Sequence, residues 1–346
     1  MSIRGAAASA AERGRGLAEA ARAGDRRSLA RLLTEVENRT AAAEAALRLL
    51  YPIAGGAHLV GLTGAPGSGK STLTAALVGE VRRSGRAAAV IAIDPSSPIT
   101  GGAILGDRVR MQAHAGDRDV FIRSMASRGH AGGLATSTVA AAAVLDAVGF
   151  PVVFIETVGT GQSEVEVAAI ADTTIVVQAP EMGDEVQAIK AGLLEVADLV
   201  VVNKGDRPGA DRAAAQLRGM LTVGASRDLP PGRPRPKRPE VLLVTALTGA
   251  GVPELLAAID RRRAGDGEVD GTAAEAARLA RAEAQLAGIL AERLQERLRD
   301  PEHAAAREAT LRAIAAHELD PYAGADRLLA LLERGGPAVA GGTAGP

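Results

Sequence analysis

The sequence predicts an α/β protein whose central domain holds a mostly parallel β-sheet, with helical extensions before and after that domain. Two observations support this class. Between residues 57 and 262, short apolar runs alternate with longer helical segments, which is typical of parallel strands joined by right-handed crossovers. The two ends of the chain show helical spacing only. We therefore divide the chain into residues 1–54, 55–262 and 263–346.

The N-terminal extension is rich in Ala and Arg and shows two apolar stripes at helical spacing. The stripes consist of Leu29, Leu32, Leu33 and Val36, and of Leu47, Leu49 and Leu50. An apolar stripe on a helix is typical of a face that packs against other elements. We therefore expect this extension to consist of amphipathic helices.

Six apolar runs in the central domain have the length of buried strands. They are His58–Thr63, Ala87–Ile93, Val152–Ile155, Thr174–Gln178, Leu199–Asn203 and Val241–Thr245. Strands that are covered by helices on both faces show such continuous apolar runs rather than alternation. A Pro- and Arg-rich stretch at 229–239 precedes the last run and is interpreted as an inserted surface loop.

The C-terminal extension begins with a polar linker at 263–271. Residues 272–333 are again helical in pattern, with Leu279, Leu286, Leu290 and Leu294 on one face. The Gly- and Ala-rich end of the chain is predicted to be disordered.

Composition excludes several classes of function. The net charge is −1 and only five aromatic residues occur, so neither a basic nor a stacking surface for nucleic acid is expected. The absence of Cys excludes disulfides and thiolate chemistry. The first residues lack a secretory apolar core, and Asp146 and Pro151 interrupt the longest apolar stretch. We expect a cytoplasmic protein without membrane spans.

The stretch GAPGSGKS, Gly64 to Ser71, matches the phosphate-binding loop G-x-x-x-x-G-K-[ST] between a strand and a helix. In such a loop, the backbone N–H groups and the helix N-terminus bind phosphate. Lys70 is expected to contact the β- and γ-phosphates, and the Ser71 hydroxyl to bind Mg²⁺. Lys occurs only four times in the chain, which favours a required role for Lys70. The predicted nucleotide-binding residues here are Gly64, Ala65, Gly67, Ser68, Gly69, Lys70, Ser71 and Thr72.

The stretch VVVNKGD places N-K-x-D directly after an apolar run. The Asp206 carboxylate can accept two hydrogen bonds from guanine N1–H and its exocyclic amine, a donor pair that adenine lacks. Asn203 is expected to hold neighbouring loops, and the Lys204 stem to lie over the base. After the next strand, the backbone of Thr245, Ala246 and Leu247 is expected near the guanine oxygen. A GTPase is therefore favoured over an ATPase.

Three carboxylates are predicted Mg²⁺ ligands together with Ser71: Asp94, Asp107 and Glu156. Carboxyl ends of parallel strands line a ligand crevice, and Mg²⁺ prefers hard oxygen donors. A helix cap is the alternative interpretation of Asp94. Glu156 lies where an Asp is commoner, which suggests contact through water.

Two further segments are predicted to change conformation during the cycle of nucleotide binding and hydrolysis. The Gly-rich turn after Glu156 can place the Gly159 amide on a γ-phosphate. Residues 179–192 carry Lys190, and either a solvated helix face or a mobile loop explains them. We include Lys190 with Lys70, Asp94, Asp107 and Glu156 among the candidate catalytic residues.

Five stretches together resemble the MeaB/ArgK group of P-loop GTPases, also called MMAA-type: GLTGAPGSGKSTL, IAIDPSSPITGGAILGDRVRM, FIRSMASRGHAGGLA, FIETVGTGQSE and VVNKGD. The resemblance covers about residues 20 to 330. It implies a G domain, and a homodimer formed through a C-terminal helical arm. It also implies GTP hydrolysis coupled to a coenzyme B12-dependent acyl-CoA mutase, most commonly methylmalonyl-CoA mutase, with adenosylcobalamin supplied by an adenosyltransferase.

The chain lacks the D-x-H-x-x-G cobalamin signature, so we expect it to bind no cobalamin itself. Two alternatives remain open on the residues. A nickel-insertion GTPase would need Cys or His clusters, whereas this chain has no Cys and five scattered His. A transport-associated ATPase or kinase would need ATP, which the N-K-x-D loop disfavours.

Overall fold

The computed structural model describes residues 3–95, 114, 116–127, 133–157, 167–180, 193–224, 239–265 and 271–334. The chain divides into two compact units, Met1–Arg281 and Ala282–Pro346, and each is described by itself. The strands are β1 (His58–Thr63), β2 (Ala88–Pro95), β3 (Val120–Ser127), β4 (Val152–Thr157), β5 (Thr173–Gln178), β6 (Leu199–Val202) and β7 (Glu240–Leu243). The helices before the second strand are α1 (Ile3–Arg22), α2 (Arg26–Glu37), α3 (Ala41–Leu50), the short 3₁₀ helix η1 (Tyr51–Ile53) and α4 (Lys70–Arg83). Those that follow are α5 (Gly133–Ala147), α8 (Ala210–Gly224), α9 (Val252–Gly265), α10 (Gly271–Arg299), α11 (Pro301–Ala315) and α12 (Pro321–Arg334).

The seven strands form one sheet in the order β3-β2-β4-β1-β5-β6-β7, and every neighbouring pair is parallel. The predicted α/β class with a parallel sheet is therefore confirmed, and each of the six predicted runs corresponds to a strand. The prediction omitted β3. This strand carries Arg123 and Ser124 in its middle, and it lies at the edge of the sheet, where one side needs no strand partner.

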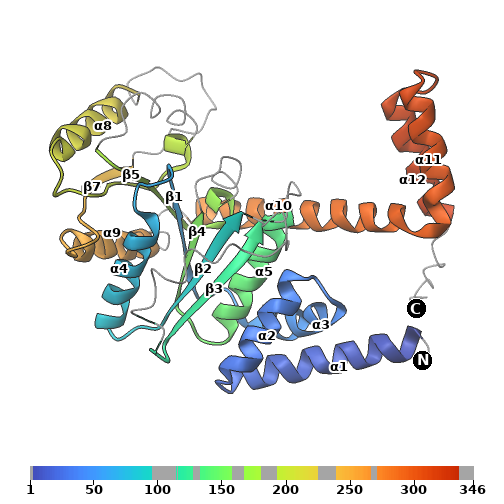
Figure 1. Cartoon of the computed structure of the whole chain (residues 1–346), viewed down its shortest axis with the longest axis horizontal. Helices are drawn as coiled ribbons and strands as arrows, with labels where there is room; N and C mark the ends of the chain where they lie inside the picture. Colours follow the sequence, from blue (N-terminus) through green and yellow to red (C-terminus); the bar gives the residue numbers. More distant parts are fainter. Residues whose placement is uncertain are drawn as a thin grey trace. The chain divides into compact units, whose positions relative to one another are not determined.

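Helices cover both faces of the sheet (Figure 1). One face packs against α4 and α9, through residues such as Val90, Phe154 and Val177. The opposite face packs against α5 near β2 and β4 and against α8 near β5 and β6. Helices α2 and α3 extend this layer by packing on α5, and α1 packs on α2 and α3. Both faces are thus buried, which is why the central strands consist almost entirely of apolar residues.

The N-terminal helices share their apolar core with the sheet. Leu32 and Leu33 of α2 are fully buried in the same cluster as Ile91 and Ile155 of the strands. The helices begin at side-chain caps, because Asp25 accepts from the backbone N–H of Arg27 and Thr40 accepts from that of Ala43. The predicted apolar stripe of α2 is therefore its packed face.

The junction between the extension and β1 is held by one carboxylate of α5. Asp146 accepts hydrogen bonds from the backbone N–H groups of Gly56 at 3.0 Å and Ala57 at 2.9 Å, and also from Gly55. A carboxylate that accepts several backbone N–H groups fixes a chain path well. This contact sets where the chain enters the first strand.

The second unit contains the end of α10 and the helices α11 and α12, which pack as a pair. Gly324 of α12 lies so close to Ile314 that a Cβ there would approach its side chain to 2.6 Å. On α10, the predicted stripe of Leu279, Leu286, Leu290 and Leu294 is exposed, from 38% to 63%. An exposed row of Leu on a long helix is typical of an interaction face.

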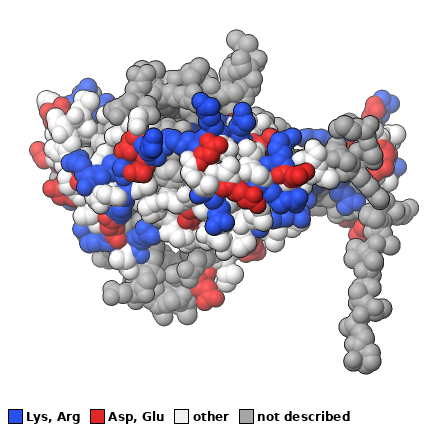
Figure 2. Space-filling model, turned by 90° about the horizontal axis from the view of Figure 1, so that it is seen from below, with Lys and Arg blue, Asp and Glu red and all other residues white. Residues whose placement is uncertain are grey.

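The surface charges are mixed on the face that Figure 2 shows, where basic and acidic side chains alternate without a large single-sign patch. This agrees with the near-zero net charge of −1. Within the described part of the chain, helices long and apolar enough to span a bilayer are absent.

Candidate functional site

The predicted nucleotide-binding segments follow the carboxyl ends of strands in one parallel sheet. The phosphate loop follows β1, and Asp94 and Glu156 lie at the ends of β2 and β4. Asn203 directly follows β6, and Thr245 follows β7. Since the strands are parallel, these ends share one edge of the sheet, the usual place for ligands in this class of fold.

The phosphate loop is held by two glycines that no other residue can replace without strain. Gly64 has φ 134°, and a Cβ there would lie 2.1 Å from the Val177 carbonyl oxygen of β5. Gly69 has φ 91°, and its Cβ would lie 2.4 Å from the Asn203 amide nitrogen. Positive φ and such close backbone approach both require glycine. The sequence G-x-x-x-x-G-K-S therefore produces a compact turn directly before α4.

Lys70 is the first residue of α4 and is only 6% exposed. Its ammonium group donates to the carbonyl oxygens of Gly64 at 2.7 Å and Ala65 at 3.1 Å. The charge thus folds back over the loop that is predicted to hold phosphate. Burying an ammonium group costs free energy unless the group is paired or hydrogen-bonded. An anion bound at the start of α4 would therefore be a favourable further partner for Lys70.

Asn203 joins three loops. Its side-chain NH₂ donates to the Ser68 carbonyl at 2.9 Å and makes a longer contact of 3.4 Å to that of Gly69. Its side-chain oxygen accepts from the backbone N–H of Ala246 at 3.1 Å. Because Asn203 is only 2% exposed, it fixes the phosphate loop and the two predicted base-recognition loops against one another.

The other predicted base-recognition residues differ in how far they are exposed to solvent. Asp206 is exposed, and Lys204 adopts φ 59°, a left-handed conformation that is uncommon for a residue other than glycine. Thr245 and Ala246 are buried at 9% and 8%, whereas the Leu247 side chain is 84% exposed. The arrangement thus combines a fixed Asn with an accessible carboxylate, as guanine recognition requires.

Two of the predicted metal ligands lie on the face of the sheet that α4 covers. Side chains two residues apart in a strand lie on the same face of the sheet. Glu156 therefore shares a face with Val152 and Phe154 of β4, and Asp94 with Ala88 and Val90 of β2. These apolar residues pack on the face that α4 covers. Asp94 and Glu156 are 2% and 3% exposed.

The Ser71 hydroxyl donates to the Glu156 carboxylate at 2.5 Å. Two buried carboxylates and a hydroxyl at the start of the phosphate-loop helix are the hard oxygen donors that Mg²⁺ takes beside phosphate, so these residues fit the ion. The described residues contain no group of three or more His, Cys, Asp or Glu suited to hold a metal alone.

Three predicted residues lie outside the described residues: Asp107, Gly159 and Lys190. The same holds for nearly all of the Pro- and Arg-rich stretch at 229–239 and for the C-terminal residues after 334. Their assigned roles stay predictions.

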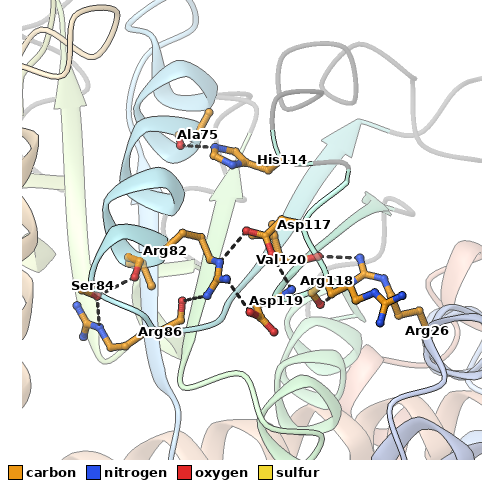
Figure 3. Close-up of polar contacts among 11 residues, drawn as sticks. Arg26, Ala75, Arg82, Ser84, Arg86, His114, Asp117, Arg118, Asp119 and Val120 are labelled. Carbon is orange, nitrogen blue, oxygen red and sulfur yellow. Dashed lines mark hydrogen bonds and ion pairs between the residues drawn. The ribbon is translucent and has the colours of Figure 1, made fainter.

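A charged cluster fastens the segment before β3 to α4 (Figure 3). Arg82 pairs with Asp117 at 2.8 Å and with Asp119 at 2.6 Å, and the His114 ring nitrogen Nε2 contacts the Ala75 carbonyl at 3.0 Å. The hydrogen bond from Arg82, and then that from the backbone N–H of Asp119, lowers the pKa of Asp117 below its ordinary 3.8. The same partner, Asp117, raises the pKa of Arg82.

Sequence reasoning missed three residues that hold β3 and the segment before it. Arg26 of α2 donates to the Val120 carbonyl oxygen, and Glu37 of α2 pairs with Arg123. Arg82 of α4 pairs with Asp117 and Asp119, as described above. Glu37, Arg26 and Arg82 are ordinary charged residues of helices, and no motif distinguishes them from solvated ones. One signal was available: Arg123 interrupts an otherwise apolar run, and a charge inside a strand often marks an edge.

Known proteins match the chain in sequence and in fold. The family model described as Methylmalonyl Co-A mutase-associated GTPase MeaB matches residues 29–303. A Pyrococcus abyssi protein, provisionally named as a GTPase, is 43% identical over 327 residues, which cover 93% of this chain and 98% of that protein. The mouse protein named methylmalonic aciduria type A homolog, mitochondrial, is 37% identical over 196 residues, 57% of this chain and 46% of that protein. A solved structure described as LAO/AO transport system kinase matches with a TM-score of 0.62 and 28% identity, over 94% of this chain and 98% of that one.

Proposed function

Since the chain belongs to the MeaB family of methylmalonyl Co-A mutase-associated GTPases, we propose that it hydrolyses GTP as the chaperone of a coenzyme B12-dependent acyl-CoA mutase. The observation that carries the GTPase assignment is the position of Asn203. Its side chain ties the phosphate loop to the N-K-x-D segment and to the loop after β7. One nucleotide can therefore meet all three segments at once.

In this proposal, the phosphate loop binds the nucleotide through its backbone N–H groups and the N-terminus of α4. Lys70 exchanges its contacts with the Gly64 and Ala65 carbonyls for phosphate oxygens, so that its charge faces the transferred group. Thr72 and Ser68 complete the same loop. Catalysis then consists of positioning and charge stabilisation, which predicts slow hydrolysis by the chain alone.

Ser71, Asp94 and Glu156 would hold Mg²⁺, with Asp107 as a further candidate, and the bound ion would neutralise charge that develops on the phosphates. Ser71 and Glu156 already contact one another at 2.5 Å, so two of these side chains are close before nucleotide binds. Asp94 and Glu156 are almost completely buried, so bulk solvent would screen their attraction to the ion only weakly.

Guanine selectivity rests on Asp206. In the proposed complex this exposed carboxylate accepts from guanine N1–H and the exocyclic amine, while the Lys204 stem covers the base. Asp206→Asn should shift the preference from GTP toward xanthosine triphosphate, because the substituted side chain can donate to the xanthine oxygen. Competition binding with the two nucleotides measures this shift, and an unaltered preference would contradict the assignment.

The mutase partnership is proposed from the family description and from the mouse relative's name. We propose methylmalonyl-CoA mutase as the first partner to test, adenosylcobalamin as the cofactor whose delivery is gated, and an adenosyltransferase as its source. The exposed Leu row of α10 is the proposed homodimer contact, and Lys190 is proposed to take part when the mutase is bound. The cytoplasm remains the predicted location.

The deciding experiment is nucleotide hydrolysis by the purified chain, with GTP or ATP, alone and with purified methylmalonyl-CoA mutase. We expect slow GTP turnover that the mutase accelerates. Slow GTP turnover without acceleration would remove this mutase as the partner and leave the GTPase. Preferential ATP turnover would overturn the guanine assignment and favour a transport-associated kinase, the activity in the name of the solved relative. Nickel insertion is disfavoured, because the chain lacks Cys.

A further inference from the structure

The strand β3 is the edge of the sheet, and its outward side is occupied by a helix of the N-terminal extension. The Asp119 carbonyl faces inward, since it accepts from the backbone N–H of Ala88 in β2. Backbone groups of successive strand residues point to alternate sides, so those of Arg118, Val120 and Ala126 face outward. Groups of this kind have no strand partner at an edge and must find another one.

Arg26, the first residue of α2, binds the amino end of this edge. Its guanidinium donates to the carbonyl oxygens of Arg118 at 2.6 Å and Val120 at 2.7 Å, and lies over the Phe121 ring at 5.3 Å. Figure 3 shows Arg26 and Arg82 reaching this segment from opposite sides. The amino end of β3 is therefore fixed between α2 and α4.

Glu37, the last residue of α2, binds the carboxyl end of the same edge. One carboxylate oxygen accepts from the backbone N–H of Ala126 at 3.1 Å, and the other pairs with Arg123 at 2.6 Å. The Glu37 and Arg123 side chains are only 13% and 17% exposed, so this pair is partly shielded from water. A charge-assisted bond to a backbone N–H is stronger than a neutral one.

The lengths of the two elements allow both contacts at once. Eleven steps along α2 from Arg26 to Glu37 span about 17 Å, and six steps along β3 from Val120 to Ala126 span about 20 Å. The helix thus runs alongside the strand and binds it near both ends. Its two terminal side chains bind backbone groups that a further strand would otherwise pair with.

Ala126 is the residue of β3 that pairs with Asp94 in the β2–β3 ladder. From this register we propose that Glu37 is a positioning residue for Asp94, acting through the backbone of Ala126. Loss of the Glu37 contact frees the end of β3 beside the point where β2 places its buried carboxylate at the proposed Mg²⁺ site. The inference rests on the proposed function, because it gives a role to Asp94 as a metal ligand.

The test measures metal binding directly. The full chain is loaded with GDP in the absence of divalent ions and titrated with Mn²⁺, a paramagnetic ion with similar oxygen preference, while free Mn²⁺ is followed by electron paramagnetic resonance. We expect Glu37→Ala to weaken Mn²⁺ binding about tenfold, the lower end of the effect of residues that orient metal ligands. GDP affinity without metal should equal that of the wild type.

Two variants separate positioning from general stability. Glu35→Ala removes a second carboxylate of α2, which pairs with Arg13 of α1 and accepts from the Thr40 hydroxyl. It should leave Mn²⁺ binding unchanged. Glu37→Gln keeps an oxygen for the Ala126 N–H but loses the charge that pairs with Arg123. It should restore most of the Mn²⁺ affinity.

The outcomes distinguish the two proposals. Normal Mn²⁺ binding by Glu37→Ala would overturn the positioning role alone, as would equal losses in Glu35→Ala or in Glu37→Gln. A wild-type GDP complex that binds no Mn²⁺ would overturn the metal site of the proposed function and this inference with it. Should Glu37→Ala fail to fold, Glu37→Asp, which retains the charge but is one methylene shorter, should still show weakened Mn²⁺ binding; wild-type affinity there would contradict the proposal.

Discussion

The guanine side and the metal side of the proposed site are held together by different means. On the guanine side, one buried neutral residue, Asn203, links three loops by hydrogen bonds within the G domain. On the metal side, charged residues of α2 and α4 hold the edge strand β3 from outside the sheet. The first arrangement is compact and local. The second depends on α2, which precedes the first strand in the chain, and on α4, which follows it.

This difference indicates which side other parts of the molecule can influence. A buried amide with fixed partners has no simple way to respond to events at the surface. Partly exposed ion pairs respond to pH, salt and binding partners, and each contributes modestly to stability. We therefore expect substitutions on the guanine side to lower the free energy of unfolding more than substitutions of the charged residues around β3.

The largest effect is expected from Asn203→Ala. The change leaves the Ser68 carbonyl and the Ala246 N–H without their buried partner, and each loss costs about 1–3 kcal/mol. The free energy of unfolding should fall by about 3 kcal/mol in total, and GDP affinity should fall with it. Urea unfolding and GDP titration measure both quantities.

A loss of GDP affinity without a loss of stability would contradict this account of Asn203, since it would show that the loops are held by other contacts. The comparison of the two sides would then lose its basis.

A smaller effect is expected from Gly69→Ala. The added Cβ would meet the Asn203 amide nitrogen at 2.4 Å, and φ is 91°. Positive φ and the clash together should lower the free energy of unfolding by about 2 kcal/mol. Gly67→Ala is the matched control, because Gly67 also has a positive φ of 76° but has no atom within 4 Å of an added Cβ. Equal losses in both variants, measured by urea unfolding, would show that the contact with Asn203 adds no cost.

The smallest effect is expected at the amino end of β3, from Asp117→Asn. Because the folded pKa of Asp117 is lowered by Arg82, its charged form contributes stability above the ordinary pKa of 3.8. That contribution is lost as pH falls through the lower folded pKa. Wild type should therefore be more stable than the variant at neutral pH, and the difference should shrink below pH 3.8.

Urea unfolding of both proteins in a series of buffers from neutral to acidic pH measures this difference. A gap that grows on acidification would contradict the assigned pKa direction, and a gap that stays constant would show that Asp117 acts through shape and not through charge.

Much of the fold could be predicted from the sequence because central strands and amphipathic helices carry strong local patterns. The run Val152–Ile155 is apolar since β4 lies between two helical layers. Val120–Ser127 escaped prediction because an edge strand carries Arg123 and Ser124 without penalty. The stripe of Leu29, Leu32, Leu33 and Val36 predicted a packed helix, but it gave no indication of which strand that helix would cover.

The candidate site divides in the same way. Lys70, Ser71 and Asn203 could be predicted as candidates because phosphate and guanine recognition need fixed residue types at fixed spacing. The contact of Ser71 with Glu156 joins residues 85 positions apart, and spacing alone does not specify it. The roles of Asp107, Gly159 and Lys190 stay predictions, since these residues lie outside the described part of the chain.

The sequence by itself determined the α/β class, the phosphate loop and the base-recognition loop, because each depends on short-range chemistry: apolar period, glycine conformation and side-chain type. Only the tertiary structure decided that Glu37 contacts Ala126, which lies 89 residues further along the chain. Ala126 in turn pairs with Asp94 in the neighbouring strand. The reason is physical. The position of a helix along a sheet edge depends on how the whole apolar core packs. The residues next to Glu37 in the sequence therefore do not reveal which strand its side chain will contact.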